Sequence, residues 1–434
     1  MGTQLLFEET NQELFAFLDK SPTAFHAAAN IAEMLEKNGY SQLLEGEKWA
    51  IEPGKGYYVM RNGSSLIAFY VPEKAFRGFR IMASHSDSPA FKIKANAEIQ
   101  VENTYLKLNV EKYGGMLMAS WMDRPLSVAG RIVVHTDHGM ETKLVNIERD
   151  LVVIPSLAIH MNRAVNEGNE LNAQRDLLPL FAQYGWEETE AGERAFLQLI
   201  ADESGVQASD ILDADLFLYP RMEATYLGLH DEFIAAPHLD DLQCVFASVK
   251  GFLAALPKLY TAVLCVLDNE EVGSSTKQGA ASTFLKDVLR RVNSSLGRTE
   301  EEYLTALADS FLVSADNAHG VHPNYTDKAD PSNRPYMNKG IVIKYSANQR
   351  YTTDAVSGAM FKLICEKAGV PWQTFHNRSD IAGGSTLGNI SGNQVAVNSV
   401  DVGLAQLAMH SCFEMAGSRD TAYLAEAARV LFEE

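Results

Sequence analysis

The chain has 434 residues, 46% of them hydrophobic and 21% charged, and its formal net charge at pH 7 is -19. The length predicts two or three globular domains with a sizeable core, and the acidic balance argues against nucleic acid or an anionic membrane as a partner. No apolar run approaches the ~18 residues of a membrane span, and the first residues lack the basic start of a secretory signal, so we expect a cytoplasmic protein.

The four cysteines each lie in or beside an apolar run, and none forms a C-x-x-C pair; they are Cys244, Cys265, Cys365 and Cys412. We expect them to be buried free thiols in a reducing compartment.

The first 90 residues combine a helix with strands. Ser21-Pro22 is typical of a helix start, and the apolar residues from Phe25 to Leu35 fall on one face of the predicted helix. Gly39 marks the end of this helical pattern. Asn62-Gly63 between two apolar runs predicts a tight hairpin. The strands expected here are 57–61, 66–71 and 79–84.

From about residue 91 the pattern changes to short β-like runs, such as Gly130 to Val134, which continue to about residue 160. A polar, Asn-rich stretch at 161–176 predicts a long loop, and a helical pattern follows around 191–200. We therefore expect an inserted, β-rich second domain over 91–235, with the first domain formed by 1–90 and 236–434.

Beyond Pro237 strands and helices alternate to the end of the chain. This alternation predicts an α/β fold, with a mostly parallel or mixed sheet that carries helices on both faces. The expected strands are 261–267, 310–315, 340–345, 372–376 and 394–400, and the expected helices are 240–256, 354–368 and 420–433.

The stretch from Asp268 to Ser274 places two adjacent acidic residues, Glu270 and Glu271, just after the apolar run 262–267. The carboxyl ends of strands are where open α/β sheets bind their ligands. Because neighbouring side chains cannot share one face, the two glutamates are expected to have different roles. By itself the pair is also consistent with a solvated acidic turn.

Other residues of types that bind metals follow the predicted strands or precede a helix. They are His85 and Asp87 after 79–84, Asp240 before a helix, Asp316 after 310–315, and His410 after 394–400. Two imidazoles with several carboxylates and no thiolate suit a catalytic zinc, cobalt or manganese site. The spacing of His85 and Asp87 suits a ligand whose ring is oriented by a carboxylate, and one aspartate can bridge two metals.

Competing motifs are absent from the sequence. It contains no H-E-x-x-H and no G-x-S-x-G, and Gly273 to Lys277 lacks the G-K-[ST] order of a phosphate loop. A glycosidase with two carboxylates would leave the two histidines unexplained.

As a set, these stretches and several others resemble the aspartyl aminopeptidases, a family of dizinc metallopeptidases in the clan of the zinc carboxypeptidases. The matching stretches run in the family's order through nearly the whole chain: 84–89, 238–242, 268–274, 314–319, 322–325, 348–351 and 406–411.

The resemblance implies two divalent ions, zinc or else cobalt or manganese. It places His85 and Asp316 on one metal, Glu271 and His410 on the other, and Asp240 as the bridge, with Glu270 as general base and Asp87 orienting His85. The family often has Arg-Leu-Asp-Asn where this chain has His238-Leu239-Asp240-Asp241, so Asp241 is a second candidate for the bridge. His319 and His322 are expected beside the site rather than as ligands.

The resemblance also implies that the inserted domain mediates dimers, which assemble into a tetrahedral homododecamer. His160 matches a histidine that enters the active site of the dimer partner. Lys344 matches the lysine that meets an acidic N-terminal side chain, and Tyr351 is expected in the same substrate-binding region.

We therefore expect an aminopeptidase that hydrolyses the N-terminal residue of peptides and prefers Asp or Glu. A metal-bridging hydroxide would attack the scissile carbonyl, Glu270 would pass its proton to the leaving amine, and His160 of the partner subunit would stabilise the oxyanion. The alternatives are an aminopeptidase with a neutral preference, a carboxypeptidase or deacylase of the same clan, and a non-catalytic shell-forming or cargo protein. The intact ligand set argues against the last of these.

Overall fold

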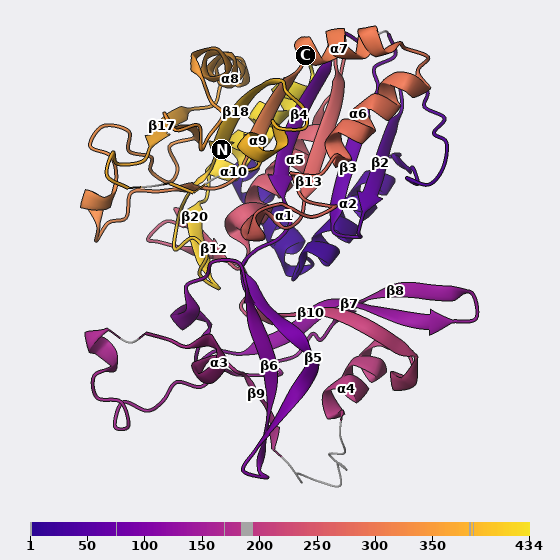
Figure 1. Cartoon of the computed structure of the whole chain (residues 1–434). Coiled ribbons are helices and arrows are strands. Elements are labelled where there is room, and N and C mark those ends of the chain that lie inside the picture. The colour runs from indigo at the N-terminus through magenta and orange to yellow at the C-terminus, as the bar shows by residue number, and fades with distance from the viewer. Residues whose placement is uncertain (1, 75, 169, 184–193, 382, 385) are drawn as a thin grey trace. The chain divides into compact units, whose positions relative to one another are not determined.

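The structure, a computed structural model, describes residues 2–74, 76–168, 170–183, 194–381, 383–384 and 386–434 (Figure 1). Contacts divide the chain into two compact units. Unit 1 comprises Met1–Asp87, Ala224–Met409 and Glu414–Glu434, and unit 2 comprises Ser88–Glu223 and His410–Phe413. The sequence analysis placed the boundaries after residues 90 and 235.

Unit 1 is built on a large mixed sheet. Its strands are β1 (Ser41–Gln42), β2 (Gly56–Arg61), β3 (Ser65–Tyr70), β4 (Phe79–His85), β13 (Thr261–Leu267), β14 (Phe311–Ala315), β16 (Ile341–Tyr345), β17 (Trp372–His376) and β18 (Asn398–Gly403). Over the described residues the sheet has nine strands in the order β1-β2-β3-β13-β4-β14-β18-β16-β17. The central strands β13, β4, β14 and β18 run parallel, and β3 and β16 pair antiparallel to them.

The parallel pairing of β4 with β13 positions the acidic stretch. Every residue of β13 is buried, as expected for a parallel strand covered on both faces. The register runs from Thr261 opposite Phe79 to Leu267 opposite His85. The residues that follow both strands therefore emerge at the same edge of the sheet.

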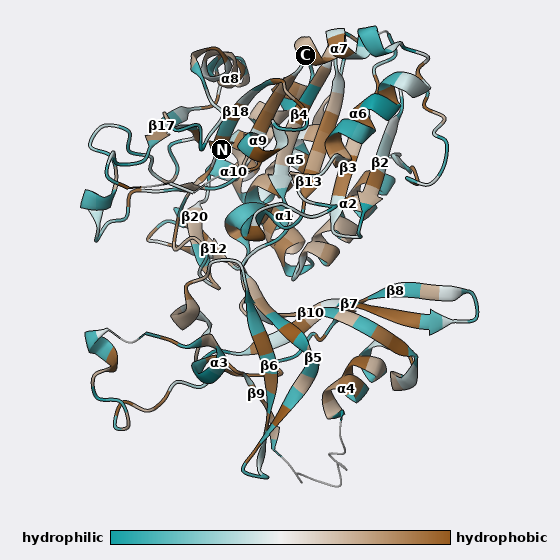
Figure 2. Cartoon of the chain, viewed as in Figure 1, coloured by the Kyte–Doolittle hydropathy of each residue, from teal (hydrophilic) through white to brown (hydrophobic). Residues whose placement is uncertain are grey.

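Helices cover both faces of the unit 1 sheet (Figure 1). One core layer contains α1 (Gly2–Asp19), α2 (Ala24–Lys37), α5 (Leu239–Ala254), α8 (Ala355–Ala368) and α10 (Asp420–Phe432). The other contains α6 (Phe284–Ser295), α7 (Glu300–Ala308) and α9 (Leu387–Ser391). Figure 2 shows hydrophobic residues concentrated on the central strands and hydrophilic residues on the visible side of α6. The expected α/β fold with helices on both faces is confirmed.

A smaller sheet completes unit 1, in the order β11-β12-β20-β19-β15. Its strands are β11 (Thr225–Leu227), β12 (Phe233–Ala236), β15 (Ala318–His319), β19 (Ala405–Leu407) and β20 (Glu414–Gly417). In this sheet β12, which precedes α5, pairs with β20 of the C-terminal segment.

Unit 2 is rich in β-structure, with a sheet in the order β8-β7-β10-β5-β6-β9. Its strands are β5 (Ala90–Val101), β6 (Tyr105–Tyr113), β7 (Leu126–Thr136), β8 (Gly139–Asn146), β9 (Leu180–Gln183) and β10 (Ile211–Pro220), and its helices are α3 (Ala173–Asp176) and α4 (Ala195–Ser204). Of the helical pattern expected at 191–200, residues 191–193 lie outside the described part of the chain. Short 3-10 turns are η1 (Met118–Trp121), η2 (Val165–Glu167), η3 (Ala208–Asp210) and, in unit 1, η4 (Glu270–Val272) and η5 (Thr326–Lys328).

Most local expectations are confirmed. The hairpin between β2 and β3 turns at Asn62 and Gly63, both with positive φ, and all four cysteines are free and buried. The strand expected at 394–400 begins only at Asn398, because the backbone N–H groups of Gln394 and Val395 donate to the oxygen of Ser391 and close a turn after α9. None of the described helices is both long enough and apolar enough to span a bilayer.

Candidate metal centre

His85 and Asp87 anchor the centre at the end of β4. The Nδ1 atom of His85 lies 3.0 Å from the backbone oxygen of Asp87 and 3.4 Å from its Oδ1. The two carboxylate oxygens of Asp87 accept the backbone N–H groups of Glu270 and Glu271, each at 3.1 Å. Asp87 thus fixes the turn η4, whose left-handed flanks are Asn269 and Gly273, against the end of β4.

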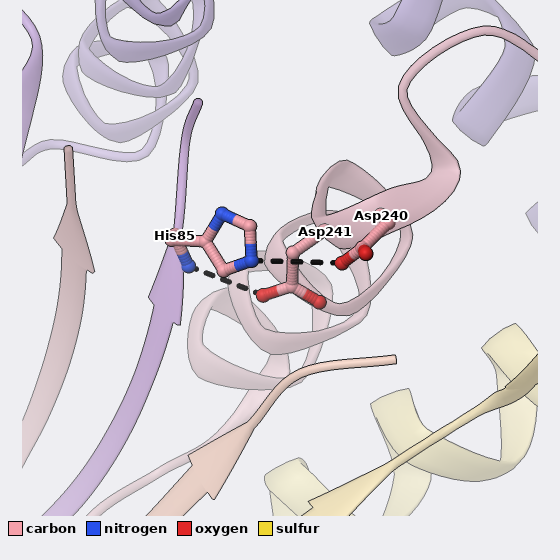
Figure 3. Close-up of side chains that lie close together, drawn as sticks. All are labelled: His85, Asp240 and Asp241. Carbon is pink, nitrogen blue, oxygen red and sulfur yellow. Dashed lines mark hydrogen bonds and ion pairs between the residues drawn. The ribbon is translucent and has the colours of Figure 1, made fainter. Parts of the chain in front are cut away.

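The start of α5 supplies two buried aspartates that contact different parts of His85 (Figure 3). The imidazole ring of His85 points towards Asp240, and its Nε2 lies 3.5 Å from Asp240 Oδ1. Asp241 Oδ2 instead accepts the backbone N–H of His85 at 3.1 Å. The backbone here is not yet helical, since both residues have non-helical φ and ψ and the peptide bond between them is cis.

The spacing of these donor atoms fits a bound metal. Ligand atoms of His85, Asp240 and Asp241 lie within 4.8 Å of one another. The same holds for ligand atoms of His85, Glu270 and Glu271. A carboxylate oxygen of Asp240 also lies within 4.8 Å of a carboxylate oxygen of Glu271. Two ligands at about 2.0–2.1 Å from a tetrahedral zinc ion lie roughly 3.3 Å apart. The 3.5 Å between His85 Nε2 and Asp240 Oδ1 matches this separation.

The concentration of buried carboxylates in the cluster also favours the binding of cations. Burial raises the pKa of Glu270 to about 7, with neighbouring carboxylates adding to the shift and His85 opposing it. Burial, reinforced by Asp240, raises the pKa of Glu271 well above its ordinary range, and burial does the same for Asp241. Burial alone would lower the pKa of His85, but the surrounding carboxylates raise it well above 6.5. Buried carboxylates at this density are stable as anions only when they are paired with cations or coordinate metals.

Asp316 and Lys344 form a buried ion pair beside this cluster. Lys344 Nζ lies 3.1 Å from Asp316 Oδ1 and donates to the backbone oxygen of Asn317 at 2.8 Å. Burial raises the pKa of Asp316, and the charge of Lys344 opposes this rise. For Lys344, burial would lower the pKa, but the charge of Asp316 raises it. The ring of Tyr351 lies 5.6 Å from Nζ. Three residues predicted for the site therefore come together around one buried ammonium group.

Two of the predicted residues belong to unit 2. His160 is exposed in a loop, and the backbone oxygen of His410 accepts the N–H of Leu117. In unit 1, the ring of His319 packs at 6.3 Å from Phe375 and that of His322 at 5.0 Å from Tyr325.

Sequence reasoning missed two buried acids. Oε2 of Glu414, the first residue of β20, accepts the backbone N–H of Asp240 at 2.8 Å and so holds the start of α5. The sequence feature that could have identified Glu414 is its position between the apolar residues Phe413 and Met415, at the start of a strand where its side chain is buried. The other acid is Asp268, whose pKa is raised to about 7 by burial and by Asp87.

Comparisons with known proteins agree with this chemistry. A family model described as Aminopeptidase I zinc metalloprotease (M18) matches residues 17–432. The chain is 47% identical over 415 residues to the Probable M18 family aminopeptidase 2 of Clostridium novyi (strain NT), covering 95% of both chains. It is 45% identical over 423 residues to the protein of the same name in Pseudomonas aeruginosa (strain UCBPP-PA14), covering 96% of both.

Solved structures share the fold over nearly the whole chain. A chain in the cryo-EM structure of the Ape4 and Nbr1 complex is 36% identical, with a TM-score of 0.94, covering 98% of this chain and 86% of that one. A chain of the S. cerevisiae mApe1 dodecamer is 27% identical, with a TM-score of 0.85, covering 97% of this chain and 95% of that one.

Proposed function

The chain belongs to the M18 family of aminopeptidase I zinc metalloproteases and is a zinc aminopeptidase; from this premise we propose that it removes acidic N-terminal residues from peptides, with Glu270 as general base. The observation that carries the proposal is the convergence of Glu270 and Glu271 on His85 at one edge of the sheet. Two adjacent carboxylates there provide one group for a metal and one for proton transfer.

We assign two divalent ions to the centre, zinc or else cobalt or manganese. His85 and Asp316 would hold one, Glu271 and His410 the other, with Asp240 between them. Asp240 is favoured over Asp241 as the bridge because the imidazole nitrogen faces Asp240, whereas Asp241 binds the backbone. Lys344 contacts only Oδ1 of Asp316, which leaves Oδ2 for a metal.

The protein groups then have distinct tasks. Two such ions, when bound, acidify a water molecule and polarise the scissile carbonyl. Glu270 accepts the proton of the attacking water and delivers it to the leaving amine. Asp87 holds the ring of His85 and the backbone of both glutamates in place. His160 of the partner subunit would donate a hydrogen bond to the developing oxyanion.

The acidic preference rests on Lys344 and Tyr351. The net charge of -19 repels acidic peptides, so a preference for them needs a local cation. Lys344 is such a cation, 3% exposed beside Asp316 and Tyr351. A hydrogen bond to a charged group contributes about 1.5–3 kcal/mol, or roughly 10–150-fold in selectivity.

Assembly into a homo-oligomer would complete the site. The mApe1 structure is that of a dodecamer, and we propose dimers built through unit 2 that form a tetrahedral dodecamer here too. The loop that carries His160 exposes large apolar side chains, with Leu157 at 56%, Ile159 at 51% and Met161 at 74% exposure. Exposed apolar patches of this kind mark protein interfaces.

A substrate panel tests the proposal. Protein stripped with a chelator and reloaded with zinc, cobalt or manganese should cleave the p-nitroanilides of Asp and Glu faster than those of Ala and Leu. N-acetylation should abolish cleavage, since an aminopeptidase requires a free amine. No cleavage of any unblocked substrate with any of the three metals would overturn the function. Faster cleavage of Leu or Ala would remove only the acidic preference.

A further inference from the structure

The peptide unit between Leu239 and Asp240 is held at both of its polar ends. Its N–H group, which belongs to Asp240, donates to Oε2 of Glu414 at 2.8 Å. Its carbonyl oxygen, which belongs to Leu239, accepts a hydrogen bond from Nδ2 of Asn317 at 3.0 Å. Because a peptide unit is planar, two contacts at its opposite edges fix the orientation of the whole plane.

A third side chain joins these two contacts. Oε1 of Gln406 accepts a hydrogen bond from Nδ2 of Asn317 at 2.6 Å, and Nε2 of Gln406 donates to Oε1 of Glu414 at 3.5 Å. Together with the peptide unit, the three side chains form a closed ring of hydrogen bonds. All three are buried, and a buried polar network whose members are paired makes its surroundings rigid.

The amide group of Asn317 is docked against the helix that carries Asp240. Its Oδ1 accepts the thiol of Cys244 at 2.9 Å, and its Nδ2 also donates to Oε1 of Gln243 at 3.1 Å. Both partners lie in α5. The backbone oxygen of Asn317 accepts the ammonium group of Lys344 at 2.8 Å. Asn317 is therefore fixed through its side chain and its main chain.

The orientation of this peptide unit affects the direction of the Asp240 side chain. Asp240 has φ of -85° and ψ of 106°, which are not helical values, so regular helix geometry does not set its direction. In the observed orientation Asp240 Oδ1 lies 3.5 Å from Nε2 of His85, and an oxygen of Asp240 lies within 4.8 Å of one of Glu271. Rotation of the peptide plane would move the carboxylate out of this position.

We propose that Asn317 and Glu414 are positioning residues of the metal centre, which clamp the peptide unit before Asp240 and so direct its carboxylate to the metals. The inference rests on the proposed function, which assigns Asp240 as the bridging ligand. Both residues act through Asp240 and not on the substrate. Groups that orient metal ligands typically contribute about 10–100-fold to metal affinity or activity.

Metal binding tests the clamp without relying on turnover. Metal-free Asn317→Leu and Glu414→Leu proteins are titrated with zinc in competition with a chromophoric chelator, and the thermal unfolding of each metal-free protein is recorded. Each variant should bind zinc about tenfold more weakly than the wild type, the low end of the range because the clamp acts through the backbone. Glu414→Gln should recover most of the affinity, since its amide oxygen can still accept the N–H of Asp240. The near-isosteric Glu414→Gln and the two separate halves of the clamp keep the test decisive if one leucine variant does not fold.

The control variant is Asn293→Leu, which removes another buried amide of unit 1. Nδ2 of Asn293 donates to the backbone oxygens of Arg298 and Thr299, in the connection between α6 and α7. Asn293→Leu should lower the unfolding temperature but leave zinc affinity unchanged.

Three results would overturn the clamp. They are wild-type zinc affinity in a folded Asn317→Leu or Glu414→Leu protein, the same loss of affinity in Asn293→Leu, and equal losses in Glu414→Gln and Glu414→Leu, which would show that only the charge of Glu414 matters. Asp240→Ala tests the premise separately, because full zinc occupancy in that variant would remove Asp240 as the bridge. Turnover of unmodified peptides by the wild type tests the proposed function.

Discussion

Replacing Glu270 by glutamine separates proton transfer from metal binding. The amide is nearly isosteric with the carboxylate, and the hydrogen bonds to Asp87 come from backbone N–H groups that the substitution leaves unchanged. Both metals should therefore stay bound. Loss of the general base should lower kcat by about 10²–10⁴, which corresponds to roughly 3–5 kcal/mol of transition-state stabilisation.

The same substitution should not destabilise the metal-free protein. The shift of the Glu270 pKa from 4.5 to about 7 penalises the ionised carboxylate by up to about 3 kcal/mol above pH 7, and partial exposure of the side chain reduces this figure. Glutamine carries no charge, so a loss of activity cannot be attributed to unfolding.

The assay pairs Glu270→Gln with Glu271→Gln. Metal content is measured by mass spectrometry after gel filtration, kcat on the best substrate of the panel, and thermal unfolding with and without chelator. We expect Glu270→Gln to keep its metals and lose turnover, and Glu271→Gln to lose metal as well. A metal-replete Glu270→Gln protein with turnover within tenfold of the wild type would refute the assignment of the base.

Four further outcomes follow from the site. Asp240→Ala should lose metal and activity together while Asp241→Ala keeps both metals, and the reverse metal contents would make Asp241 the bridge. In the zinc-loaded enzyme, Lys344→Met should erase the preference for acidic over neutral substrates but spare slow cleavage of neutral ones; an unchanged ratio of kcat/KM values would contradict this role. Chains carrying His160→Ala should regain activity when co-assembled with Glu270→Gln chains, and verified mixed oligomers no more active than either parent would exclude action in trans. Without metal, the folded state binds the Glu270 proton more tightly than the unfolded state, so the contribution of Glu270 to stability is greatest below about pH 4.5 and falls as the pH rises to about 7; a melting temperature in chelator that rises over this interval relative to that of Glu270→Gln would show the opposite linkage.

Local sequence determined the elements that carry the chemistry. The apolar run of β13 and the turn residues Asn62-Gly63 identify strand and hairpin because periodicity and turn preferences act within a few residues. The position of Glu270 and Glu271 just after a buried strand placed them at the edge of the sheet where ligands bind. Helix α1 was missed, because its buried residues, such as Leu14, gain their stability from packing against distant parts of the core.

Tertiary structure alone decided how the charged groups are paired. Lys344 meets Asp316, 28 residues away, because strand β18 lies between β14 and β16 in the sheet, and no local pattern encodes that order. The choice between Asp240 and Asp241 as the bridge depends on which of the two side chains faces the His85 ring. The fold sets this orientation at the start of α5, where the backbone N–H of Asp240 donates a hydrogen bond to Glu414. Sequence gives the kinds of groups available, and the long-range packing of the chain determines which of them are buried together and must neutralise one another.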